Sequence, residues 1–193
     1  MKLLSSSCLL LAALVGTAPV IAETVAPTPP ARVRLSPHET ISTAIGKGGP
    51  RITITYGRPF SKHPKTGEVR KIWGGLVKWD KADRLGADEA TLLLTQQPLQ
   101  FGDVVIPAGA YTLYIVPSEK SSSQLVFSSN LGKWGDPMDE THDVARVALT
   151  KADISQSVGQ LTLDVKANAA GDGGEITIQW ESTQLSAAFT IKK

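Results

Sequence analysis

The chain has 193 residues, with 20 Lys and Arg against 18 Asp and Glu, and a single cysteine, Cys8. Its formal charge of +2 is scattered along the sequence and forms no basic stripe, which argues against nucleic acid as a partner. Because no cysteine follows residue 8, the body of the chain has no disulfide, no thiolate metal site and no cysteine nucleophile.

The first 22 residues have the pattern of an export signal. Lys2 precedes an apolar stretch from Leu3 to Val15, and Val20-Ile21-Ala22 suits a signal peptidase, which predicts a mature start at Glu23. The apolar stretch is shorter than the roughly 20 residues that a membrane-spanning helix needs. We therefore expect residues 1–22 to be a signal peptide, and the mature protein to be periplasmic or secreted without a transmembrane segment.

A proline-rich tether, residues 23–35, is expected to follow the signal. Residues 26–31 read Ala-Pro-Thr-Pro-Pro-Ala, which is typical of an extended and poorly ordered connection. We expect residues 36–193 to form a single domain.

Alternation of apolar and polar residues with a period of two dominates this domain and predicts β-strands. The clearest runs are residues 52–56, 111–115, 161–166, 176–181 and 185–191, with further candidates at 40–45, 90–95, 124–128 and 145–149. Only short helical turns are predicted, at 73–77 and 139–144. One buried face per strand favours an all-β fold, an antiparallel β-sandwich of jelly-roll-like type. A closed, lipocalin-like barrel would produce the same alternation and is the alternative.

A long connection separates the strand that ends near Tyr56 from the one that begins near Ala90. It is rich in Arg, Gly and Trp, and long loops in compact domains are usually either functional or disordered. Ile72, Trp73 and Val77 would favour burial, so we expect one long, ordered crossover loop.

Several motifs in and around this loop occur in a recognisable order. They are Ser36-Pro37-His38-Glu39-Thr40, Tyr56-Gly57-Arg58-Pro59, Arg70-Lys71-Ile72-Trp73-Gly74-Gly75-Leu76-Val77, Gly86-Ala87-Asp88-Glu89-Ala90-Thr91, Ile106-Pro107-Ala108-Gly109-Ala110-Tyr111-Thr112-Leu113-Tyr114 and Trp134-Gly135. Together they resemble a secreted bacterial family known as domain of unknown function 2911. The resemblance implies an exported, single-domain β protein, and it brings no established activity.

The chain departs from that family pattern at two places in the loop. Residues 78–83 read Lys-Trp-Asp-Lys-Ala-Asp where Pro-Tyr-Gly-Lys-Val-Trp would be expected, and residues 63–68 resemble an insertion. A pocket built by this loop therefore need not keep the shape that it has elsewhere in the family.

Arginines and carboxylates at the two ends of the loop are the strongest candidates for a site. Arg58 follows one strand, Arg84 lies late in the loop, and Asp88 and Glu89 precede the next strand. Guanidinium groups bind carboxylates and other anions in bidentate geometry. The functional interpretation is an anion or sugar site with Trp73 or Trp79 as an apolar platform. The structural interpretation is an ion-pair network that holds the loop against the sheet.

Other chemistry has weaker support in the sequence. His38, His63 and His142 show no ligand spacing, so neither a metal nor a cofactor is predicted, and we expect His63 to face solvent. No Gly-x-Ser-x-Gly elbow occurs. A glycoside hydrolase would need two carboxylates at a set separation, which sequence does not provide. The candidates for that pair are Asp88, Glu89, Asp139 and Glu140.

These observations predict a non-catalytic β-sandwich that binds a small ligand, a glycan or an envelope component through Arg58, Trp73, Arg84, Asp88 and Glu89. A carboxylate-dependent hydrolase acting on an envelope or glycan substrate is one alternative. An interaction module that pairs through exposed edge strands is another.

Overall fold

A computed structural model describes residues 34–135 and 137–192, so the predicted signal peptide and most of the tether lie outside the described residues. The described residues form ten strands and one 3₁₀ turn. The strands are β1 (His38–Ala44), β2 (Arg51–Gly57), β3 (Thr91–Thr95), β4 (Leu99–Phe101), β5 (Val104–Ile106), β6 (Gly109–Val116), β7 (Gln124–Ser128), β8 (Asp143–Ala148), β9 (Thr150–Ala167) and β10 (Gly173–Ile191). The 3₁₀ turn, η1 (Glu140–His142), precedes β8.

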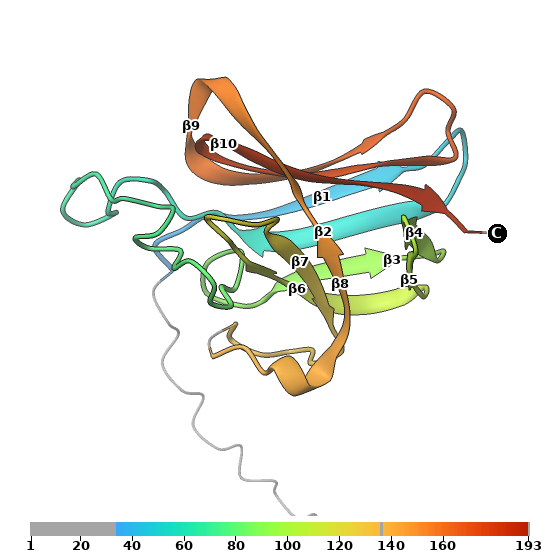
Figure 1. Cartoon of the computed structure of the whole chain (residues 1–193), viewed down its shortest axis with the longest axis horizontal. Helices are drawn as coiled ribbons and strands as arrows, with labels where there is room; N and C mark the ends of the chain where they lie inside the picture. Colours follow the sequence, from blue (N-terminus) through green and yellow to red (C-terminus); the bar gives the residue numbers. More distant parts are fainter. Residues whose placement is uncertain (1–33, 136, 193) are drawn as a thin grey trace, which may run out of the picture. The chain divides into compact units, whose positions relative to one another are not determined.

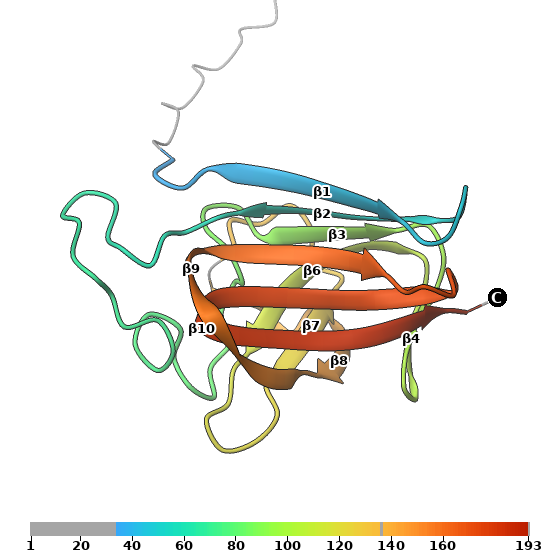
Figure 2. The same ribbon diagram turned by 90° about the horizontal axis from the view of Figure 1, so that it is seen from above.

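The strands are arranged in two antiparallel sheets, one above the other (Figure 1, Figure 2). The six-stranded sheet has the order β1-β2-β3-β6-β7-β8, and the four-stranded sheet has the order β5-β4-β10-β9. The prediction of an antiparallel β-sandwich is confirmed, and two sheets take the place of the barrel that alternation alone had left open.

The core lies between the two sheets and is filled by the alternating residues. Ile52, Ile54 and Tyr56 of β2 are almost fully buried, while Thr53 and Thr55 between them are only partly so. Phe101 of the four-stranded sheet packs against Phe127 of the six-stranded sheet, with ring centroids 5.6 Å apart. Burial of these side chains is the main favourable contribution to folding, at roughly 25 cal/mol for each Å² of apolar surface.

The differences from prediction lie at the ends of the sheets. Strands β4 and β5, of three residues each, form a hairpin that was not among the predicted strands, and Gly102 makes its turn with a φ of 54°. Residues 73–77 form a turn closed by a parallel bridge from Trp73 to Val77 and not a helical turn. Strand β9 begins at Thr150, well before the predicted run at 161–166.

The two predicted C-terminal strands are one continuous strand, β10, with a local irregularity. Its register with β9 shifts between Gln179 and Glu181, and again between Glu181 and Thr183. Glu181 has a φ of 53°, in the left-handed region that residues with a side chain seldom adopt. Such bulges bend a strand and redirect its side chains. This one lies under the crossover loop, next to Trp180.

Candidate functional site

The crossover loop, residues 58–90, is fixed to the sandwich at both of its ends. Its first arm runs beside β9, where Ser61 N donates to the Gly159 carbonyl at 2.8 Å and Leu161 N donates to the Pro59 carbonyl at 3.0 Å. The indole Nε1 of Trp180 donates to Ser61 Oγ at 3.1 Å. The two main-chain bonds use the free edge of β9, and together with the bond from Trp180 of β10 they position the start of the loop.

The second arm of the loop runs beside β6. Asp83 N donates to the Ile115 carbonyl at 2.8 Å, and Ile115 N donates back to the Asp83 carbonyl at 2.9 Å. Between the two arms, the loop side chains of Ile72, Val77 and Leu85 are buried in the core. The loop is therefore ordered, as predicted, and main-chain hydrogen bonds and apolar burial hold it.

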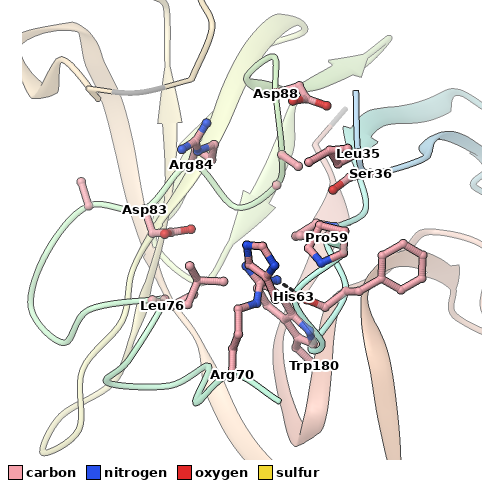
Figure 3. Close-up of a pocket in the computed structure, with 16 residues that line it drawn as sticks. Leu35, Ser36, Pro59, His63, Arg70, Leu76, Asp83, Arg84, Asp88 and Trp180 are labelled. Carbon is pink, nitrogen blue, oxygen red and sulfur yellow. Dashed lines mark hydrogen bonds between the residues drawn. The ribbon is translucent and has the colours of Figure 1, made fainter. Parts of the chain in front are cut away.

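A pocket of about 440 Å³, which we call the loop pocket, lies between these two arms (Figure 3). Apolar side chains, among them Leu76, Val77 and Trp180, form part of its lining. Its charged or ionisable lining residues are His63, Arg70, Asp83, Arg84 and Asp88. Figure 3 shows the Asp83 carboxylate and the His63 ring extending toward the space from different sides. The lining thus combines two guanidinium groups, two carboxylates and an apolar surface.

Two of the five predicted site residues, Arg84 and Asp88, line the loop pocket. Arg58 is outside it and acts as a link between sheets. Its Nη1 lies 3.3 Å from Glu39 Oε2 of β1, and its Nε and Nη2 donate to the Leu161 carbonyl at 3.2 Å and to Thr162 Oγ1 at 2.9 Å, both in β9.

The other two predicted residues also lie away from the loop pocket. Trp73 stacks on Trp79 with ring centroids 6.3 Å apart, and its Nε1 donates to the Trp180 carbonyl at 3.4 Å. Glu89 pairs with Arg34 and with His38, whose Nε2 lies 3.0 Å from Glu89 Oε2. The structure therefore does not bring the five predicted residues together in one cluster.

The remaining carboxylates that a hydrolase could have used belong to another region. Asp139 caps η1, accepting hydrogen bonds from Thr141 N at 3.1 Å and Thr141 Oγ1 at 2.6 Å, which lowers the pKa of its carboxyl group. Glu140 Oε2 accepts a hydrogen bond from Arg146 Nη2 at 2.6 Å. Of the four carboxylates considered from the sequence, Asp88 is the one that lines the loop pocket.

Asp88 has an unusual environment for a carboxylate. Its Oδ2 is buried and accepts no hydrogen bond from the residues that the structure describes. Its backbone has a φ of 65°. A buried acceptor without a partner costs roughly 1–3 kcal/mol, and a left-handed backbone adds strain for a residue with a side chain. Asp88 is therefore held in place by its surroundings at a cost in stability.

Strained backbone in the described residues gathers around this region. The non-glycine residues with positive φ are Asp80, Leu85, Asp88 and Glu181. The first three belong to the crossover loop, and the fourth is in the bulge of β10 beneath it. Such conformations tend to cluster at functional sites, where the rest of the fold enforces them.

Among the pocket residues that sequence reasoning missed are Asp83, Arg70, Trp180 and His63. Arg70 begins the motif Arg70–Val77, but from that motif only Trp73 was predicted to be a site residue. Trp180 belongs to the alternating run 176–181, in phase with Ile176 and Ile178, which predicts a core position, and its side chain is 3% exposed. The alternation does not indicate that Trp180 also borders the pocket. His63 was expected to face solvent, and it is instead partly buried at the wall of the pocket.

No group of three or more His, Cys, Asp or Glu side chains within residues 34–135 and 137–192 could hold a metal ion. Over the same residues, no helix has the length and apolar character needed to cross a membrane.

Comparison with known proteins gives a family. The profile of the family described as "Protein of unknown function (DUF2911)" matches residues 36–189. The chain belongs to the DUF2911 family. The comparisons with curated proteins and with solved structures gave no match. The DUF2911 region contains the whole crossover loop and all residues of the loop pocket except Leu35. The site therefore lies within the part of the chain that defines the family.

Proposed function

We propose that this DUF2911 protein binds a small, neutral, polyhydroxylated ligand such as a saccharide in the loop pocket, without covalent chemistry. The observation that carries the proposal is the mixed lining of the pocket. Arg70 and Arg84 supply hydrogen-bond donors, Asp83 and Asp88 supply acceptors, and their formal charges cancel. A hydroxyl group both donates and accepts, so a polyol can satisfy both kinds of residue. A small anion would meet two carboxylates, and a small cation would meet two guanidinium groups.

The size and rigidity of the pocket support the same proposal. A volume of about 440 Å³ falls in the range of small-molecule sites, which are mostly preformed and combine apolar walls with a few placed polar groups. The main-chain bonds of both loop arms hold such polar groups in position before a ligand arrives. Less ordering is then needed on binding, which favours affinity.

A ligand screen on the chain lacking residues 1–22 tests this proposal. Neutral mono- and disaccharides should raise the melting temperature, and phosphate, acetate and putrescine should not. A ligand at one hundred times its Kd adds about 2.7 kcal/mol to stability, which in a domain of this size is roughly 5–10 °C. Arg84→Gln should remove the saccharide response, while Leu94→Asn, on the opposite side of the six-stranded sheet from the core, should keep it. A larger response to phosphate or acetate than to any saccharide would overturn the proposal.

We also propose that the protein works after export, in the periplasm or outside the cell. The apolar stretch after Lys2 and the Val20-Ile21-Ala22 sequence support this location. Intact mass measurement of the protein from fractionated cells should give a chain that starts at Glu23. A full-length chain confined to the cytoplasmic fraction would contradict the proposal.

A further inference from the structure

A second cavity adjoins the loop pocket on the side of β9. This apolar groove has a volume of about 620 Å³. Its lining includes Leu35, Phe60, His63, Pro64, Val69 and Glu181. Four of these residues, Leu35, Phe60, His63 and Pro64, also line the loop pocket, so one wall separates the two spaces.

Exposed apolar side chains concentrate at this pair of cavities. Eight large hydrophobic residues of the described chain are exposed, and Leu35, Phe60, Val69 and Leu76 all line one or both cavities. Val69 is the most exposed of the eight, at 69%. Single exposed hydrophobics are normal, but a gathering beside a polar pocket marks a binding surface.

The wall of the groove is a fixed part of the backbone. Residues 62–69 fold back on themselves, with an antiparallel bridge from Lys62 to Val69 and a hydrogen bond of 2.7 Å from His63 N to the Glu68 carbonyl. Phe60 forms a bridge to Gln160 of β9. On the opposite side, the bulge of β10 places Trp180 at the loop pocket and Glu181 at the groove. One irregularity of the sheet thus contributes to both cavities.

We propose that the ligand is an amphiphile: its hydroxylated head occupies the loop pocket, and an alkyl chain attached to that head lies along Phe60 and Val69 in the apolar groove. The placement of the head rests on the proposed function, and the binding of an alkyl chain in the groove is the new part of the inference. Polar and charged lining on one side of a shared wall and apolar lining on the other match a molecule with those two parts. Burying methylene groups against the exposed side chains supplies affinity that a free saccharide lacks.

The test is a series of glucosides with methyl, butyl, hexyl and octyl chains, titrated calorimetrically below their micelle-forming concentrations. Affinity should rise about two- to fourfold with each added methylene until the groove is filled, as expected for partial to complete burial. Val69→Asn should lower this dependence on chain length, and Val69 is so exposed that the change should not disturb folding. The matched control is Leu94→Asn, an exposed leucine of β3 at 47%, which should leave the whole series unchanged.

Asp88→Asn separates the two parts of the ligand. It should weaken all four glucosides by a similar factor while the gain for each methylene persists. If methyl glucoside binds and longer chains bind no better, the amphiphile inference is wrong and the saccharide proposal stands. If Val69→Asn weakens octyl glucoside binding but Asp88→Asn and Arg84→Gln have no effect on it, the groove binds the alkyl chain and the proposed site for the head is wrong. Absence of binding by all four would overturn both.

Competing occupants of the groove give other results. If a second copy of this chain covers it, the protein will dimerise with increasing concentration, and Val69→Asn will abolish the dimer in light-scattering measurements. That outcome, or a chain-length dependence abolished by Leu94→Asn and not by Val69→Asn, would overturn the proposal.

Discussion

Asp88 is the residue at which stability and binding are most directly opposed. Its buried Oδ2 lacks a hydrogen bond from the described residues, and its φ of 65° suits asparagine as well as it suits aspartate. We expect Asp88→Asn to raise the free energy of unfolding by roughly 0.5–1 kcal/mol, because an amide is less costly to bury than a charge. The same change should weaken saccharide binding. Urea denaturation and calorimetric titration of the variant check both effects, and a less stable variant that binds normally would make Asp88 a structural residue.

Arg58 provides the contrasting case, an arginine whose contacts are internal. Its salt bridge to Glu39 is partly solvated and contributes little by itself, whereas its two hydrogen bonds reach across to β9. Arg58→Ala should therefore reduce the free energy of unfolding by about 1–3 kcal/mol and leave saccharide affinity intact. Urea denaturation and calorimetric titration of Arg58→Ala and Arg84→Ala in parallel distinguish a structural arginine from a ligand-binding one. Loss of ligand binding in a stable Arg58→Ala variant would place Arg58 in the site after all.

At the scale of the element, the end of β2 and the end of the crossover loop are locked together at Gly57. A Cβ added to Gly57 would lie 2.2 Å from the Ala87 carbonyl oxygen, closer than atoms can approach, and main chain cannot move aside as a flexible side chain does. Gly57→Ala should therefore displace residues 86–88, lower the free energy of unfolding by roughly 2–4 kcal/mol as other severe core changes do, and abolish ligand binding.

A matched control for Gly57 exists in β9. A Cβ added to Gly159 would meet no atom within 4 Å, so Gly159→Ala should be neutral or stabilise by up to about 1 kcal/mol, since alanine loses less conformational freedom on folding. Hydrogen exchange over residues 58–90 should increase in Gly57→Ala and stay the same in Gly159→Ala. Equal effects of the two substitutions would show that the close approach at Gly57 does not hold the loop.

Elements also show how far the sequence could lead. Alternation predicted β2 because its apolar residues share one buried face, and apolar anchors predicted an ordered loop because Ile72 and Val77 favour burial. The hairpin of β4 and β5 was not predicted, because strands of three residues on either side of Gly102 are too short to show an alternating pattern.

The site was only partly predictable for a different reason. Trp180 borders the pocket because β10 has a bulge there. Such a bulge is a shift in strand register, which cannot be recognised from the pattern of apolar and polar residues.

The whole molecule depends on side chains that join the two sheets where β1 and β2 approach β9. Thr43 Oγ1 donates to the Val165 carbonyl at 2.8 Å, and the hydroxyl of Tyr56 accepts a hydrogen bond from Leu163 N at 2.9 Å while it donates to Glu39 Oε2 at 2.8 Å. Arg58 continues this row with its bonds to Leu161 and Thr162. No disulfide is available to take over this role, because Cys8 is the only cysteine. The contact between sheets and the start of the crossover loop therefore share one row of polar side chains.

This row makes global stability sensitive to alkaline pH. Burial, followed by the hydrogen bond and the charge of Glu39, raises the pKa of Tyr56 from 10.0 to about 12. Burial and Asp143 raise the pKa of Tyr114 as well. Between pH 10 and 12 the unfolded chain releases these protons before the folded chain does, so the folded state binds more protons there and the free energy of unfolding must fall as pH rises. Below pH 10 the contribution of both tyrosines is fully present.

Tyr56→Phe separates the hydrogen bonds of this tyrosine from its ionisation. At pH 7 the variant should be less stable by about 1–3 kcal/mol, because Leu163 N loses its acceptor inside the sandwich. Above pH 10 the variant should lose stability more slowly than the parent, since the raised pKa of Tyr56 is gone while those of Tyr111 and Tyr114 remain. Urea denaturation at intervals from pH 7 to pH 11.5 gives both curves, and they should converge at the alkaline end. Parallel curves would mean that the Tyr56 hydroxyl titrates equally in the folded and unfolded chain, and that the two sheets are not joined through it.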